Sequence, residues 1–331
     1  MPVVVRSYLV VMLVCFSSSF ACALDLAPFT TSNQNPLVAV YGLPVAAPAL
    51  VLQPGQTEVE IRLDLASLSS QGSREGEAIL LDGETMRSTL ALRRGVGTRL
   101  EIGLEIPYVR HAEGFLDNFI LDWHDFFNLP QGERENSPRD RLLYHYERDG
   151  EVLINQDDEE GGFGDLRLIG GWQLQRQSQG DICSSVLRAS LKLPTGDEKA
   201  LLGSGSTDLA LWLSTSRSLD GGSVALFGAI GALVLTDGDL LPDQQRHLVG
   251  FGSAGVGWQP YSWLAFKLQL DGHSAFYDDS AMAELSDSMQ LAIGGSLGFG
   301  AKTTLDLAVV EDVVVDSAPD FVFHLALRRL F

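Results

Sequence analysis

Two side chains near the end of this 331-residue sequence have the types and spacing of a catalytic pair. Asp271 and His273 are two residues apart, so on a β-strand both side chains lie on one face, where a carboxylate and an imidazole can activate water. Ser274 follows directly and points to the opposite face, which disfavours a histidine–serine nucleophile pair. A polar pair at the edge of a loop is the commoner explanation. We therefore predict no catalytic residues.

A second group could bind a metal ion. Asp122, His124 and Asp125 lie within four residues, and carboxylate oxygens with an imidazole can hold a divalent cation. The acidic run at 157–160 lacks the glycine and the spacing of a calcium loop. A solvated acidic loop is the commoner explanation of both stretches. We keep the three residues as external-loop ligand candidates and predict neither a metal site nor a cofactor.

The third and largest group consists of charged side chains that alternate with apolar ones along predicted strands. On a closed barrel these charges would face the lumen, where neighbouring strands can pair opposite signs. They would either fill the lumen with salt bridges or line a narrow polar conduit, and the expected diameter favours some passage. The lumen-lining candidates are Glu58, Glu60, Arg62, Asp64, Arg87, Arg93, Arg99, Glu101, Glu105, Asp165, Arg167, Arg188, Lys192 and Lys267.

The strands that would position these charges show a period of two residues. Val59, Ile61 and Leu63 alternate with charged neighbours, which is typical of a strand with one apolar and one polar face. Most segments approach the 9–11 residues that a tilted strand needs to cross a bilayer. We predict twelve segments: 57–66, 79–93, 98–109, 164–176, 182–193, 206–217, 223–236, 247–258, 263–271, 288–297, 302–310 and 321–331.

Short and long connections alternate between the segments, as turns and external loops do in outer-membrane barrels. The chain ends on Phe331, and Phe321 and Phe323 alternate in phase with it, which is typical of the terminal strand recognised by the barrel-insertion machinery. The predicted fold is all-β: a transmembrane antiparallel up-and-down β-barrel of about twelve strands over 56–331. One long extracellular loop spans 110–163.

The start of the chain indicates export. Residues 1–23 have a weakly positive start, an apolar run and a small-x-small cleavage site, which together predict a signal peptide. After cleavage Cys183 has no cysteine to pair with, so a disulfide scaffold is excluded. Residues 24–55 are neither a helix nor a clean strand, and they could line the lumen, plug it or remain periplasmic. The predicted location is the outer membrane, with both termini periplasmic.

The formal charge of −20 excludes nucleic acid as a partner, because phosphate binding needs a basic surface. The excess lies in the long connections, while the rest of the mature chain holds equal numbers of acidic and basic residues. We therefore expect an acidic outer rim beside outer-membrane lipid and lipopolysaccharide. Such a rim would favour bridging divalent cations and would select neutral or cationic solutes.

Several strings resemble the domain of unknown function 3187 family, which comprises predicted outer-membrane β-barrel proteins of Gram-negative bacteria. The strings are Asn33-Gln34-Asn35-Pro36, Tyr41-Gly42-Leu43-Pro44, Gly103 to Tyr108, Trp123 to Pro130, Gly162 to Asp165, and Leu191 to Gly196. The resemblance implies a fold and a location, and it supplies no catalytic residues.

We expect a narrow channel or uptake protein for a small solute, with the long loop as a lid or constriction. Two alternatives stay open. One is a hydrolase at the outer leaflet, since Asp271 and His273 are similar to the Asp-x-His pair of omptin proteases. The other is a closed structural or adhesive barrel.

Overall fold

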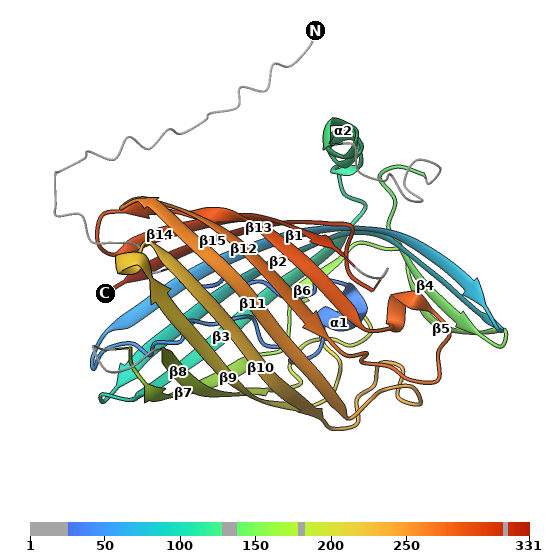
Figure 1. The fold of residues 1–331 in the computed structure, drawn as a ribbon. Coiled ribbons are helices and arrows are strands. Elements are labelled where there is room, and N and C mark those ends of the chain that lie inside the picture. Colours follow the sequence, from blue (N-terminus) through green and yellow to red (C-terminus); the bar gives the residue numbers. More distant parts are fainter. Residues whose placement is uncertain (1–25, 128–137, 178–182, 314–316) are drawn as a thin grey trace, which may run out of the picture.

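A closed antiparallel barrel forms the body of the molecule. The computed structural model describes residues 26–127, 138–177, 183–313 and 317–331, and within them fifteen strands make one continuous sheet. Pairing of the first strand with the last closes the barrel (Figure 1). Its twelve strands are β1 (Thr57–Arg74), β2 (Glu77–Val96), β3 (Leu100–Ala112), β7 (Arg167–Gln175), β8 (Ser184–Lys192), β9 (Asp208–Leu219), β10 (Val224–Leu235), β11 (Leu248–Tyr261), β12 (Leu264–His273), β13 (Ser288–Phe299), β14 (Thr303–Asp312) and β15 (Phe321–Leu330).

The alternation along the strands arises because one face of the wall is exposed and the other turns inward. Ile61, Ile102 and Ile230 are exposed on the outer surface, whereas Arg62 and Glu101 between such residues are buried. An apolar outer band is the surface that a bilayer requires of a barrel. The predicted fold, a transmembrane barrel of about twelve strands, is confirmed.

The two ends of the barrel differ. At the turn end, short connections join β2 to β3, β9 to β10 through the 3₁₀ turn η2 (Asp220–Gly222), β11 to β12 and β13 to β14. The longer connections, one of which contains the 3₁₀ turn η3 (Ala283–Leu285), lie at the opposite, loop end. Exposed basic side chains occupy the turn end: Arg94, Arg99, Arg217, Lys302 and Arg329.

Arg99 is therefore not where the sequence placed it. We predicted that it lines the lumen, but β2 ends at Val96 and the turn takes residues 97–99, so Arg99 is exposed before β3 begins. Period-two alternation identifies a face only while the strand lasts, and the strand ended earlier than expected.

The β1–β2 hairpin is longer than predicted. Residues 67–78 were expected to be a loop, but they continue both strands to a two-residue turn at Glu75 and Gly76. Both turn residues have positive φ, 53° and 87°, as the tightest hairpin turns require. The strands stay paired beyond the barrel because β4 (Leu143–Arg148) continues the sheet beside β2, and β5 (Glu151–Gln156) pairs with β4.

The region predicted as one long loop thus contains secondary structure. Besides β4 and β5 it holds β6 (Glu160–Phe163), which pairs with the end of β3, and the helix α2 (Asp117–Phe127). Figure 1 shows α2 outside the barrel wall. There Leu116 and Ile120 pack on Phe321 of β15.

The metal-ligand candidates lie on this helix. Asp122 and Asp125 are exposed on α2, and the side chain of His124 lies outside the described part of the structure. Among the described residues, no group of three or more His, Cys, Asp or Glu side chains is placed to hold a metal ion. In the same part of the chain, no helix has the length and apolar character needed to cross a membrane.

An apolar core caps the lumen at the loop end. Tyr144 and Tyr146 of β4 are fully buried there, together with Phe276 and the short helix α1 (Pro36–Ala39). β4 thus acts as a lid over the lumen, whereas α2 from the same connection covers the outer wall.

The lumen and its inserted hairpin

Residues 26–55 run through the barrel as a hairpin, which we call the lumen hairpin. Leu26 packs on Ala225 and Ala265 at the turn end. The chain then rises through the lumen to α1 at the loop end, and it descends along the opposite wall to Gly55, whose N–H bonds Gly95 O at the turn end. Figure 1 shows this segment inside the barrel. Both ends of the hairpin therefore lie at the same mouth.

Wall side chains bind the backbone of the ascending limb. The side-chain amide of Gln269 (β12) accepts from Phe29 N at 2.8 Å and donates to Phe29 O at 3.2 Å, as a neighbouring strand would. Higher up, Asn33 Nδ2 donates to His273 Nε2 at 2.9 Å and to Ser317 O at 3.0 Å. Backbone groups of the ascending limb therefore form their hydrogen bonds with wall side chains, and the limb does not become a strand.

The descending limb is held in the same way from β7, β8 and β9. Gln173 Oε1 accepts from Val51 N at 2.9 Å and Gln173 Nε2 donates to Ala49 O at 3.0 Å, while Gly42 N donates to Asp208 Oδ2 at 2.6 Å. Cationic side chains donate to other carbonyl groups of the hairpin: Arg87 to Ala39, Lys192 to Val40 and Arg188 to Pro48.

Aromatic rings hold the tip of the hairpin within the apolar core. Tyr41 stacks on Phe276 with centroids 4.8 Å apart, and Tyr277 donates its hydroxyl to Leu37 O at 2.7 Å. Burial raises the pKa of the Tyr41 and Tyr277 phenols well above the usual value, so both stay neutral at physiological pH.

The inward charges form chains of ion pairs rather than isolated bridges. The first chain joins β7, β3, β1, β15, β14 and β12 in the order Arg167–Glu105–Arg62–Glu60–Arg328–Asp306–Lys267. The second joins β1, β2, β3 and β8 in the order Glu58–Arg93–Glu101–Arg188. A third group places Lys192 Nζ 2.6 Å from Asp165 and 3.3 Å from Asp208. Removing one member of such a chain leaves its partner buried and uncompensated.

Nearly all predicted lumen residues come together in this network. Eleven of the fourteen candidates take part in the ion pairs above, Asp64 lies 2.7 Å from His324 Nδ1, and Arg87 binds the hairpin carbonyl of Ala39. Arg99, on the exposed turn, is the exception. Sequence reasoning missed the uncharged clamps Gln173 and Gln269, although both alternate in phase with the charged positions on their strands.

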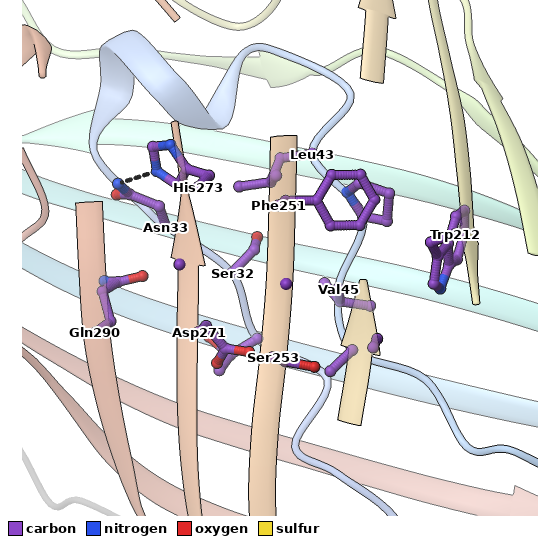
Figure 2. A pocket seen from close by; sticks show the side chains of 16 residues that line it. Ser32, Asn33, Leu43, Val45, Trp212, Phe251, Ser253, Asp271, His273 and Gln290 are labelled. Carbon is purple, nitrogen blue, oxygen red and sulfur yellow. Dashed lines mark hydrogen bonds between the residues drawn. The ribbon is translucent and has the colours of Figure 1, made fainter. Parts of the chain in front are cut away.

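Asp271 and His273 lie in a cavity of about 30 Å³ between the two limbs of the hairpin and β9–β13 (Figure 2). They do not form the pair considered from the sequence. His273 Nε2 is occupied by Asn33 and its Nδ1 donates to Ser274 O, while Asp271 accepts from Gln269 at 2.8 and 3.1 Å. Two further cavities, of about 30 and 40 Å³, lie between the hairpin and the charged strands. Each has room for only a few water molecules.

Comparison with solved structures finds outer-membrane channels. The COG4313 outer membrane channel from Pseudomonas putida F1 matches with a TM-score of 0.56 at 15% identity, covering 85% of this chain and 97% of that one. The Ralstonia pickettii toluene transporter TbuX matches with a TM-score of 0.43 at 10% identity (85% and 90%), and the KdgM porin with 0.43 at 7% (83% and 99%). These likenesses concern the fold.

No curated protein sequence matches the chain. A family model does match, over residues 4–331, and its description is "Protein of unknown function (DUF3187)". This match covers the barrel, the lumen hairpin and the loop-end cap together. The chain therefore belongs to the DUF3187 family.

Proposed function

We propose that the protein is an outer-membrane channel for small solutes and that the lumen hairpin closes it in the state described here. The observation that carries the proposal is the way in which the lumen is filled. A segment of the chain occupies it, held only by noncovalent contacts, and both ends of that segment lie at the turn end. Such a segment can leave the lumen without opening the barrel wall.

The wall is suited to an open state. With the hairpin withdrawn, the ion-pair chains still satisfy most inward charges, so the strands need no rearrangement to face water. Twelve strands also give a diameter between that of a packed eight-stranded barrel and that of a wide porin. Polar and charged side chains would then line a conduit for small solutes.

Deleting residues 27–52 tests the proposal. Full-length protein in a planar bilayer should pass little current, and the deletion variant should pass a steady current, because the segment that fills the lumen is gone. A heat-dependent shift in electrophoretic mobility checks that the variant still folds as a barrel. A folded deletion variant that passes no more current than the full-length protein would refute the channel.

A graded variant keeps the hairpin but weakens its anchors. Replacing Gln173 and Gln269 with Ala removes the two amides that bind the backbone of the limbs. Each lost hydrogen bond costs about 1 kcal/mol, so the double variant should open more often than the full-length protein. Ser185→Ala on β8, whose side chain forms none of these contacts, is the matched control.

A further inference from the structure

The wall of β9–β13 carries two adjacent inward rows of side chains that the ion-pair chains do not use. Strand register aligns them across the sheet. The upper row consists of Trp212, Gly231, Phe251 and His273, and the lower row of Ser214, Ala229, Ser253, Asp271 and Gln290. We call these two rows the row patch.

The upper row presents an aromatic surface. The rings of Trp212 and Phe251 meet edge to face, with centroids 6.2 Å apart, across Gly231. A Cβ at Gly231 would lie 2.4 Å from Trp212 Cβ and 2.7 Å from Phe251 Cζ, so only glycine permits this contact. Aromatic faces of this kind attract apolar groups and cations.

Asp271, in the lower row, differs from the other lumen carboxylates. Seven of those form an ion pair with a lysine or an arginine, and Asp64 is bonded to His324: the seven are Glu58, Glu60, Glu101, Glu105, Asp165, Asp208 and Asp306. Asp271 accepts only from the neutral amide of Gln269, and no cationic side chain of the described residues lies within 4.0 Å of it. Its carboxyl group therefore has no cationic partner in the wall and is placed to accept one from outside it.

Two buried donors that line the same cavity as Asp271 lack acceptors. Trp212 Nε1 and Gln290 Nε2 have no hydrogen-bond partner, although their side chains are only 3% and 2% exposed. Both residues line the cavity that also holds Asp271 and His273 (Figure 2). A buried donor without an acceptor costs about 1–3 kcal/mol, a penalty that a ligand carrying an acceptor would remove.

We propose that the row patch binds a small organic cation, namely a protonated amine with an apolar or aromatic body. The ammonium group would donate to Asp271 and the body would pack on Trp212 and Phe251; in ligands that also carry an acceptor atom, this atom would satisfy Gln290. Leu43 and Val45 of the lumen hairpin cover the patch and leave only about 30 Å³, so the ligand takes their place when the hairpin moves. The proposal rests on the channel function, because solute reaches the patch through the lumen.

Three probes of similar size and different charge test it: benzylammonium, benzyl alcohol and benzoate. Their binding to the folded 27–52 deletion variant in detergent is measured by calorimetry. Benzylammonium should bind at least about tenfold more tightly than benzyl alcohol, and benzoate more weakly than either. Equal binding of the cation and the alcohol would overturn the proposal.

Variants assign the preference to the patch. Asp271→Asn should reduce benzylammonium binding to the level of benzyl alcohol, whereas the same change at Asp220, on an exposed turn at the turn end, should alter nothing. Trp212→Ala should weaken the binding of benzylammonium and of benzyl alcohol alike. An unchanged cation preference in Asp271→Asn would exclude this site.

The outcome separates this proposal from the channel itself. A deletion variant that conducts but shows no cation preference refutes the patch alone, and one that binds benzylammonium without conducting refutes the channel alone. Should the deletion variant not fold, Leu43→Ala widens the cavity in the full-length protein, and the same three probes apply with the same expectations.

Discussion

The inward side chains on the two sides of the lumen differ in charge. On β1–β3, β7 and β8 many inward positions carry a charge, and these charges compensate one another in chains. On β10 and β11 the inward positions carry no charge at all and include Ala229, Gly231 and Phe251. We refer to these two regions as the charged wall and the sparse wall.

The charged wall binds the backbone of both limbs of the lumen hairpin. It donates to the descending limb through Lys192 and Arg188, and to the ascending limb through Arg62, which bonds Thr30 O. Hydrogen bonds that involve a charged group are about twice as strong as neutral ones. The ascending limb also bonds to the neutral side chains of Gln269 and His273. We therefore expect the hydrogen bonds to these neutral side chains to break before those to the charged wall.

The largest expected effect comes from breaking an ion-pair chain on the charged wall. Arg62→Ala removes the cation that Glu60 and Glu105 share and leaves each buried carboxylate with one longer pair, to Arg328 and to Arg167, which should lower the free energy of unfolding by about 3 kcal/mol. Ser253→Ala on the sparse wall is the matched control, with an expected loss below about 1 kcal/mol. Denaturant unfolding in detergent, followed by the electrophoretic mobility shift, measures both. Similar losses for the two variants would contradict the contrast between the walls.

A smaller effect should come from crowding the sparse wall. Gly231→Ala forces a Cβ against Trp212 and Phe251, and overpacking of this kind costs about 1–3 kcal/mol of unfolding free energy. Gly250→Ala on the next strand is the control, because a Cβ there meets nothing within 4 Å. The same denaturant assay compares them, and equal stability of the two variants would show that the Trp212–Phe251 contact does not need glycine.

The smallest effect concerns the ends of the barrel rather than its walls. If the acidic loop end favours cations, the reversal potential of the 27–52 deletion variant should show cation preference at low salt. That preference should shrink as ionic strength rises, because the screening length falls from about 30 Å at 0.01 M to about 10 Å at 0.1 M. A preference that does not change with salt would place selection at the lumen wall instead.

The barrel could be predicted from the sequence because each strand shows its apolar and polar faces in its own residues. Alternation such as Val59–Glu60–Ile61–Arg62 reports a two-faced wall directly, and it identified the inward charges before their partners were known. The extension of β1 through Ser69, Ser70 and Gly72 was missed, because small polar residues carry no period. Helix α2 was missed too, although Leu116, Phe119, Ile120 and Trp123 have helical spacing.

The lumen hairpin could not be predicted in the same way. Its residues show no regular alternation of apolar and polar side chains, because each limb bonds to side chains of the wall and not to a neighbouring strand. The partners Gln269 and Phe29 are 240 residues apart, so their pairing exists only once the barrel has closed. Likewise, the sequence suggested Asp271 and His273 as a pair, but the hairpin residue Asn33 donates a hydrogen bond to Nε2 of the imidazole.

Because Leu26 and Gly55 lie at one mouth, the order of synthesis does not dictate the order of assembly. The hairpin precedes every barrel strand in the sequence, yet it needs no strand to be threaded past it and can fold into a barrel that is already complete. Its contacts span strands from all around the lumen, so they form only after closure. The first part of the chain described here is thus expected to be the last to reach its native position, and its docking would report that the wall around it is correctly formed.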